Sequence, residues 1–145
     1  MDLEYKKFEE KDLDMLIKFY MDYYNSQGGT WTDDIARKRI HQIATMEDSL
    51  VILQLDKERL SGFLMGYVKY FDDSKGFFLE EILISSEFQC RGYGTKLLHY
   101  LKEELAKSNC SWIELLTTTS ELHQRFYTKN GYRLSGKLVL EHLDL

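Results

Sequence analysis

The stretch that decides the fold reads F-F-L-E-E-I-L-I-S-S-E-F-Q-C-R-G-Y-G-T-K-L-L and covers residues 77–98. It begins as an apolar strand, passes through a loop rich in small and hydrogen-bond-donating residues, and ends in a helix. Gly92 and Gly94 allow the backbone to pass close to a ligand where that helix starts. The first N–H groups of a helix attract anions. The turn therefore suits a pyrophosphate, with Gln89 and Arg91 as additional donors.

Two familiar phosphate-binding loops do not fit this turn. A Rossmann fingerprint requires a third glycine at position 97, where the chain has Leu97. A Walker loop requires Gly-Lys followed by Ser or Thr, which is also missing. By itself, Gly-x-Gly ahead of a helix is a weak signal, because it is also typical of a tight strand-to-helix turn without a ligand.

The remaining sequence predicts further strands and helices on both sides of this stretch. Hydrophobic periodicity and turn residues place them, in chain order, as a strand at 2–8, a helix from 13 to 24, a helix starting at Thr32, strands at 50–55, 60–71 and 77–84, a helix at 92–107, a strand at 112–116, a helix at 120–130 and a strand at 132–142. The order βααβββαβαβ predicts an α/β domain with a mixed, mostly antiparallel sheet. Because its strands are almost continuously apolar, we expect helices on both faces.

Composition limits the class of protein. A chain of 145 residues with 43% hydrophobic residues is the size of one globular domain, here residues 1–145. A net charge of −5 argues against binding to nucleic-acid phosphates and fits a cationic partner. No apolar run suggests a membrane span or a signal peptide, which predicts a cytoplasmic protein. Neither the cysteines Cys90 and Cys110 nor the histidines have the spacing of metal ligands, so we expect no metal.

Two motifs resemble a known family. Residues 89–94, Q-C-R-G-Y-G, fit the pattern Q/R-x-x-G-x-G/A, and residues 126–132, F-Y-T-K-N-G-Y, look like F-Y-x-x-x-G-F. Through these motifs and the order of its elements, nearly the whole chain resembles the GNAT acetyltransferase superfamily. The motifs are most similar to those of diamine and small-amine acetyltransferases.

This resemblance implies acetyl-CoA as the co-substrate. It also suggests a homodimer, which is common in the family. The pantetheine arm would pair with the backbone of Ile82, Leu83 and Ile84. The pyrophosphate would lie on the loop residues Gln89, Cys90, Arg91, Gly92, Tyr93, Gly94 and Thr95. Ser120 stands where many members carry an asparagine that bonds the cofactor arm, and Tyr127 is expected to contact the cofactor as well.

Glu80 and Glu81 interrupt an apolar strand. Strict alternation would send them to opposite faces, so that one lies on a largely buried face. A buried charge is costly unless it is partnered or functional. The glutamate on that face could form a salt bridge or lie at a strand end near solvent. Alternatively it is a general base, because an alkyl amine with a pKa near ~10.4 must lose a proton before it attacks a thioester. The resemblance favours Glu80 as this base and leaves Glu81 in reserve.

Tyr127 is either a core aromatic or a general acid. Its F-Y-x-K-x-G-Y context favours the acid, since a phenol with a pKa near ~10 can protonate a thiolate whose conjugate acid lies near ~8.5. A backbone N–H at Leu83 or Ile84 would hold the thioester oxygen. Neither cysteine has a partnered base nearby in sequence, which favours direct transfer in a ternary complex.

The sequence says less about the molecule that receives the acetyl group. Tyr24 and Trp31 flank the junction of the first two helices, which in the resembled fold borders the acceptor pocket, and Glu81 is a third candidate there. Aromatic faces can bind a cation. A small cationic amine of polyamine or aminoglycoside type is favoured. A protein or peptide amine, or a non-catalytic acyl-CoA-binding sensor, are the alternatives.

Overall fold

The computed structural model describes all 145 residues and contains one five-stranded sheet in the order β1-β2-β3-β4-β5. The strands are β1 Leu3–Lys7, β2 Ser49–Asp56, β3 Arg59–Tyr70, β4 Lys75–Ile84 and β5 Ile113–Leu115. Strands β1 to β4 pair antiparallel with their neighbours, and β5 pairs parallel with β4. The predicted mixed, mostly antiparallel sheet is confirmed.

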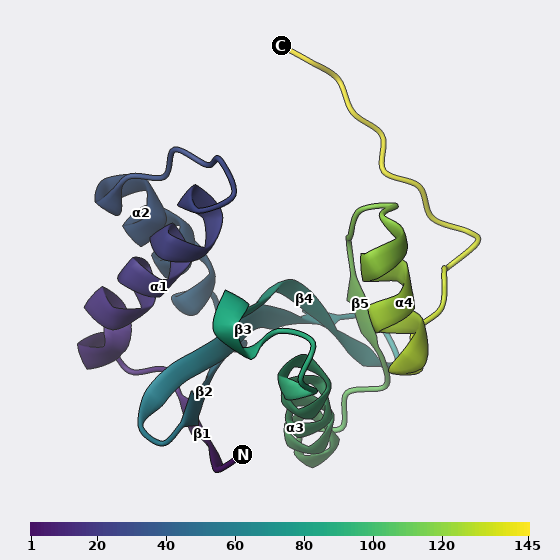
Figure 1. The fold of residues 1–145 in the computed structure, drawn as a ribbon. Helices are drawn as coiled ribbons and strands as arrows, with labels where there is room; N and C mark the ends of the chain where they lie inside the picture. Colours follow the sequence, from purple (N-terminus) through teal and green to yellow (C-terminus); the bar gives the residue numbers. More distant parts are fainter.

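Four α-helices flank the sheet. They are α1 Leu13–Asn25, α2 Asp33–Ala44, α3 Tyr93–Lys107 and α4 Glu121–Lys129, with short 3-10 turns at Glu10–Asp12 and Ser86–Phe88. In Figure 1, α1 and α2 lie together over one end of the sheet, α3 lies under the opposite face, and α4 stands beside β5 at the other end. The predicted helices therefore form, and they cover both faces. None of them combines the length and the apolar character that a bilayer crossing requires.

The core is divided by the sheet into two clusters. Val51 and Phe63 point toward α1 and α2, whereas their neighbours Ile52 and Leu64 point toward α3. All four side chains are buried, because successive residues of a strand face opposite sides and each side is covered by helices. This explains why the central strands read as continuous apolar runs.

Strand β4 is bordered unequally by its two neighbours. Its pairing with β3 runs from Lys75 to Ile84, but its pairing with β5 covers only Phe77–Leu79. From Glu80 to Ile84, the backbone groups that point away from β3 therefore have no strand partner. This free edge leads directly to the loop that starts α3.

A β-bulge interrupts β4 at the same place. Met65 pairs with Glu81 and Gly66 pairs with Leu79, so Glu80 is an extra residue without a partner on β3. The two strands approach closely here, because a Cβ on Gly66 would lie 2.2 Å from the carbonyl oxygen of Phe78. Only glycine fits opposite this bulge, and the bulge changes the direction of the side chains that follow it.

The predicted closing strand at 132–142 is wrong. The chain beyond Tyr132 has no regular secondary structure and runs away from the sheet as an extended tail (Figure 1). A strand requires an adjacent edge for its backbone hydrogen bonds, and the only backbone hydrogen bond recorded between the tail and another element joins Tyr132 N–H to Tyr127 at the end of α4. The residues of the tail favour a strand, but no strand edge lies beside them with which their backbone could pair.

Candidate active site

The start of α3 is an uncapped helix terminus. Gly92 occupies the N-cap position with φ of +84°, and no side chain accepts a hydrogen bond from the first turn. The first intrahelical bond runs from the Lys96 N–H to the Gly92 carbonyl. The N–H groups of residues 92–95 thus precede the helical hydrogen-bond ladder, and they stand at the positive end of the helix dipole. These groups can bind an anion.

Buried hydrogen bonds hold this helix start against β2. The side-chain amide of Gln54 donates to the Tyr93 carbonyl at 3.0 Å, and the Ser61 hydroxyl donates to the Gln54 side-chain oxygen at 2.9 Å. The Tyr93 hydroxyl donates to Asp56. Because the Tyr93 side chain is buried, only the backbone of this predicted cofactor residue can face a ligand. Gln54 was not identified from the sequence, although a glutamine within an apolar strand is a signal for such a role.

The loop before α3 is also fixed by its own side chains. Gln89 donates to the Ile84 carbonyl at 2.9 Å, and Arg91 donates to the Glu87 carbonyl at 3.2 Å. Cys90 has φ of +58° and, like Gln89 and Arg91, is exposed. Gln89 thus closes the loop onto the end of β4, while the charge of Arg91 remains at the surface beside the helix start.

Three elements meet at Gly94. A Cβ at this position would lie 3.0 Å from the Phe126 ring of α4 and 3.6 Å from Ile84 of β4. The neighbouring Thr95 hydroxyl accepts a hydrogen bond from the Asn130 side chain at 3.2 Å, which ties α3 to the end of α4. A larger residue at 94 would therefore press on the Phe126 ring, and the helix start lies beside the free edge of β4.

The other predicted residues of this edge lie in β4. Ile82 and Ile84 pack toward α3, whereas Leu83 packs into the cluster under α1 and α2. Their side chains serve the core, so their contribution to a ligand is limited to the backbone. An extended chain that carries amide groups could pair with this backbone as an added strand.

Glu80 and Glu81 do not lie on opposite faces, contrary to the prediction. Arg39 of α2 contacts both: its Nη2 lies 3.1 Å from Glu80 Oε1, and its Nε lies 3.1 Å from Glu81 Oε2. The bulge at Glu80 is the reason, because the extra residue breaks the alternation that separates adjacent side chains. Both carboxylates are thus partnered on the side of the sheet that α1 and α2 cover.

Glu81 is the more enclosed carboxylate of the two. Its side chain is 10% exposed, against 22% for Glu80. It accepts hydrogen bonds from the Tyr20 hydroxyl at 2.8 Å and from the Tyr24 hydroxyl, in addition to Arg39. A carboxylate with three charge-assisted partners is held in one orientation.

The charges of this cluster shift the pKa of its members. Burial works against the charge of Arg39, but its hydrogen bond to Glu80 and the charges of both glutamates outweigh burial and raise its pKa. Burial, followed by the neighbouring Glu81, raises the pKa of Tyr20 and Tyr24 far above the usual range of a phenol. All three donors therefore keep their protons at neutral pH.

Arg39 and Tyr20 were not identified from the sequence. The position of Arg39 in α2 could have identified it, since Arg39 stands three residues after Ala36 and next to Ile40, both of which face the core. A charged residue on the inward side of a helix calls for a buried partner of opposite charge.

The two predicted aromatic residues lie in the same region. The Trp31 ring meets the Tyr20 ring edge-on, with centroids 4.9 Å apart, and lies 5.9 Å from the Tyr24 ring. Tyr24 also contacts the Tyr23 ring. The rings pack on the core cluster beneath α1 and α2, and they surround the carboxylate of Glu81 on the helix side.

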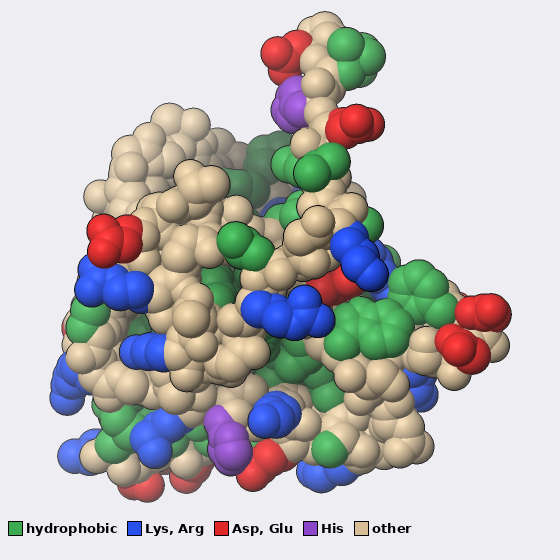
Figure 2. All heavy atoms as spheres, turned by 90° about the vertical axis from the view of Figure 1, so that its right-hand side faces the viewer, with side chains coloured by type: hydrophobic (Ala, Val, Ile, Leu, Met, Phe, Trp, Pro, Cys, Tyr) green, Lys and Arg blue, Asp and Glu red, His purple; other side chains and the backbone are tan.

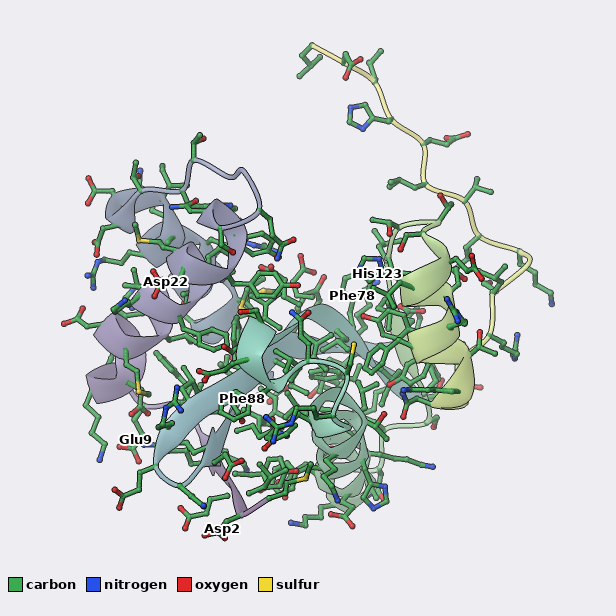
Figure 3. All side chains as sticks on the ribbon, viewed as in Figure 1. Asp2, Glu9, Asp22, Phe78, Phe88 and His123 are labelled. Carbon is green, nitrogen blue, oxygen red and sulfur yellow. The ribbon has the colours of Figure 1, made fainter.

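Tyr127 faces this group from α4. Burial, followed by the nearby phenol of Tyr23, raises the pKa of Tyr127 to about 12. Its ring packs against Phe126 and Tyr132, whose centroids lie 5.0 Å and 5.6 Å away. In Figure 3, Phe78 of β4 lies on the sheet between the α1–α2 pair and α4, which separates the two helical groups. Tyr127 therefore lies near Tyr23 of α1, although the two residues belong to helices at different ends of the sheet.

Ser120 has a structural role in this chain. Its hydroxyl accepts a hydrogen bond from the His123 N–H at 3.3 Å and thereby caps α4. Serine is among the residues favoured at this position. No group of three or more His, Cys, Asp or Glu side chains is placed to hold a metal ion.

The sequence of residues 13–132 matches the model of the acetyltransferase (GNAT) family. The chain belongs to this family. Two curated relatives are uncharacterized proteins of Bacillus subtilis (strain 168). YdhI is 33% identical over 77 residues, which are 52% of this chain and 47% of YdhI. YxbD is 38% identical over 61 residues, which are 41% of this chain and 38% of YxbD. The matches thus span less than half of the length of either relative.

Solved structures share the GNAT fold over nearly the whole chain. A probable acetyltransferase superposes with a TM-score of 0.84 at 19% identity and covers 98% of this chain and 97% of its own. A GNAT family acetyltransferase of Staphylococcus aureus subsp. aureus USA300_TCH1516 has a TM-score of 0.78 at 21% identity, covering 99% and 100%. The aminoglycoside N-acetyltransferase AAC(6')-Iy, solved in complex with CoA, has a TM-score of 0.80 at 14% identity, covering 99% and 95%.

The cluster around Glu81 predicts a specific response of stability to alkaline pH. The folded-state pKa values of Tyr20 and Tyr24 lie above those of the unfolded chain. Their contribution is therefore complete below about pH 10 and is lost as the pH rises further, because the unfolded chain then releases protons that the folded chain retains. The double variant Tyr20→Phe/Tyr24→Phe should be less stable at pH 7 by about 1–3 kcal/mol, since Glu81 loses two donors.

Urea unfolding between pH 7 and pH 11 measures this effect. The double variant should lose less stability than the wild type above pH 10. Tyr67→Phe, at a tyrosine without a hydrogen bond to a carboxylate, serves as the control and should follow the wild type. Parallel curves for the wild type and the double variant would contradict the assignment.

Proposed function

We propose that this GNAT family member transfers the acetyl group of acetyl-CoA directly to a primary amine of a small cationic molecule. The observation that carries the proposal is the free edge of β4, which runs from the glutamates to the uncapped start of α3. The family match and the CoA complex of the related AAC(6')-Iy support acetyl-CoA as co-substrate.

The residues present fit a ligand of this chemistry. In the proposal, the N–H groups of residues 92–95 and the Arg91 side chain bind the pyrophosphate of acetyl-CoA. The amide groups of its pantetheine arm pair with the backbone of residues 82–84, which has no strand partner on that side. Acetyl-CoA supplies an activated thioester. A backbone N–H at Leu83 or Ile84 polarises the thioester oxygen.

Glu80 is the proposed proton acceptor. Its carboxylate is bound on one oxygen by Arg39, whereas Glu81 accepts from Arg39 and two tyrosines. The freer and more exposed Glu80 has lone pairs left for the ammonium group or for a bridging water. Glu81 then acts as a positioning residue, because it fixes the Arg39 side chain that holds Glu80.

The charge and the aromatic rings of the cluster favour a cationic acceptor. Two carboxylates face one guanidinium, so Glu80, Glu81 and Arg39 carry a net charge of −1 (−2 plus +1). Tyr24 and Trp31 add aromatic faces beside them. These features support a polyamine or an aminoglycoside-like amine as the acceptor.

Tyr127 is the proposed acid that protonates the leaving thiolate. With its pKa raised to about 12, the phenol stays protonated throughout the neutral range. The same shift makes the phenol a weaker acid, so in the proposal its proton passes to the sulfur only while the thiolate is forming beside it. Tyr127 lies on α4, so the proposed donor and the proposed acceptor Glu80 of β4 come from different elements of the fold.

A panel of amines tests the proposed function through release of free thiol from acetyl-CoA. We expect release with polyamines or aminoglycosides and little release with a lysine-containing peptide. Arg91→Glu should weaken acetyl-CoA binding about tenfold or more in calorimetry, which is about 1.4 kcal/mol, because it places a negative charge beside the pyrophosphate. Lys38→Glu, the same change of charge at an exposed position of α2, should bind as the wild type does.

Binding of acetyl-CoA without thiol release by any amine would instead identify a non-catalytic sensor. Release with the peptide alone would move the acceptor class to protein amines. Unchanged affinity in a folded Arg91→Glu variant would remove Arg91 from the pyrophosphate site.

Glu80→Gln should lower turnover most near neutral pH. The loss should shrink as the pH rises, because the amine then loses its proton without assistance. Glu81→Gln should lower the melting temperature more than Glu80→Gln does, since three donors lose a charged partner. Rate profiles between pH 6 and pH 10 for both variants, together with melting curves, provide the measurement. The neutral-pH loss in Glu81→Gln alone would transfer the role to Glu81.

Tyr127→Phe keeps the ring and deletes the hydroxyl. A purely structural tyrosine would leave stability and rate nearly unchanged. As a general acid, Tyr127 should contribute about 10²–10⁴-fold to turnover, with little change in acetyl-CoA affinity. Turnover beside melting temperature decides between these roles, and Tyr132→Phe is the matched control on the adjacent ring. Wild-type turnover in a stable Tyr127→Phe variant would leave solvent as the proton donor.

A further inference from the structure

The loop between β4 and α3 is held at both of its ends by the hairpin of β2 and β3. At the start of the loop, the Ser85 N–H donates to the Ser61 carbonyl at 2.9 Å. At its end, the Tyr93 carbonyl accepts from the side-chain amide of Gln54 at 3.0 Å. Gln54 belongs to β2 and Ser61 to β3. Residues 85–93 therefore span two anchors on neighbouring strands.

The two anchors are bonded to each other. The Ser61 hydroxyl donates to the side-chain oxygen of Gln54 at 2.9 Å, and both residues are completely buried. The second amide hydrogen of Gln54 faces the Tyr5 hydroxyl, with the nitrogen and the oxygen 3.5 Å apart. Gln54 thus uses its oxygen toward one end of the loop and its nitrogen toward the other. A fully partnered polar group in the core has one fixed direction.

This pair lies level with the end of the free edge of β4. Gln54 pairs with Gly62 of β3, and Gly62 pairs in turn with Ile84, the last residue of β4. The strands meet closely here, because a Cβ on Gly62 would lie 2.7 Å from the Leu83 carbonyl oxygen. The buried amide therefore stands at the place where the edge of β4 passes into the loop.

The backbone of the loop requires such support. Cys90 has φ of +58°, which is unfavourable for a residue with a Cβ, and Gly92 has φ of +84°. Strained conformations persist only where the surrounding structure enforces them. The hydrogen bonds that Gln89 and Arg91 make within the loop come from exposed side chains. Anchors buried away from water hold the loop more firmly than these exposed contacts do.

The general charge of the protein gives little attraction to a pyrophosphate. The net charge is −5. Figure 2 shows the face that carries α4 and the tail, where Lys and Arg side chains are scattered among other groups and form no continuous basic patch. Affinity in the proposed site therefore comes chiefly from well-directed N–H groups at the start of α3. The directions of these groups depend on how firmly the loop is held.

We propose that Gln54 and Ser61 are positioning residues that set the affinity for the pyrophosphate of acetyl-CoA. The inference rests on the proposed function, because it concerns the same cofactor loop. Neither side chain reaches the ligand, since both are fully buried. They act through the Tyr93 carbonyl and the Ser85 N–H, and they hold the N–H groups of residues 92–95 in one arrangement before the ligand arrives. Less ordering is then required on binding.

A comparison of two ligands tests this role. Gln54→Met keeps the length of the side chain and removes both hydrogen-bonding ends. It should weaken acetyl-CoA binding about tenfold, which is about 1.4 kcal/mol, and leave S-acetyl-pantetheine, which has no pyrophosphate, nearly unchanged in NMR titrations. Ile43→Val, in the core cluster under α1 and α2, is the control. It should lower the melting temperature without changing the ratio of the two affinities.

Ser61→Ala tests the bond between the anchors. It should weaken acetyl-CoA binding in the same direction. The double variant Gln54→Met/Ser61→Ala should bind no more weakly than Gln54→Met alone, because the Ser61 hydroxyl acts on the loop through Gln54. Ser61→Ala is also the milder change, so it carries the ligand comparison if Gln54→Met does not fold. An equal loss of affinity for S-acetyl-pantetheine in either variant would overturn the proposal.

Hydrogen exchange of the protein without ligand provides a readout that does not depend on acetyl-CoA. The Lys96 amide makes the first hydrogen bond of α3, and in Gln54→Met it should exchange about tenfold faster. The amide of Leu101 in the middle of α3 should be unaffected. Unchanged exchange at Lys96 would contradict the clamp. A wild type that does not bind acetyl-CoA would instead remove the proposed function, and titration with inorganic pyrophosphate together with exchange would then decide the role of Gln54.

Discussion

The unequal pairing of β4 is the constraint on which the rest of the structure depends. Hydrogen bonds to β3 extend along the whole strand, whereas those to β5 stop after Leu79. The backbone N–H and C=O groups along the remaining edge have no strand partner. They cannot be buried in an apolar core, because unpaired backbone groups are costly when they are shielded from water. It is therefore open at the place where the chain turns into α3, and the strand, the loop and the helix start form one continuous polar path.

Polar side chains are tolerated next to this path because each is partnered. Arg39 lies between the two glutamates, and Tyr20 and Tyr24 complete the shell of Glu81. A buried charge cluster of this kind adds little stability over an apolar core, but removal of one member is costly. It holds a carboxylate beside the strand edge in one orientation. On the opposite side of the sheet, the buried amide of Gln54 holds the first turn of α3 in the same manner.

The two ends of the molecule are packed to different degrees. The helices α1 and α2 and the strands beneath them share a cluster of twelve buried residues, whereas α4 buries none of its own. Tyr127 thus stands on a helix without buried residues, whereas Glu80 stands on a strand that pairs with β3 from end to end.

Local sequence determined the order of the elements almost completely. Of the six strands and four helices predicted from apolar periodicity, five strands and all four helices form. This pattern is visible in the sequence because it depends on residues that are near one another in the chain. The Gly92 turn was equally clear, since only glycine readily adopts its positive φ. Two features escaped for the opposite reason. The bulge at Glu80 depends on Gly66, and the pairing of both glutamates depends on Arg39, more than forty residues away from them.

The fate of the tail also lay beyond local sequence. Residues 132–142 have the composition of a strand, but a strand exists only where another edge meets it, and that depends on which surfaces the folded chain leaves open. Sequence by itself therefore determined the helices, the strands, the loop and the candidate residue types. Tertiary structure decided which carboxylate is more exposed, which edge is open and which segment stays unpaired, because these properties arise from contacts between distant parts of the chain.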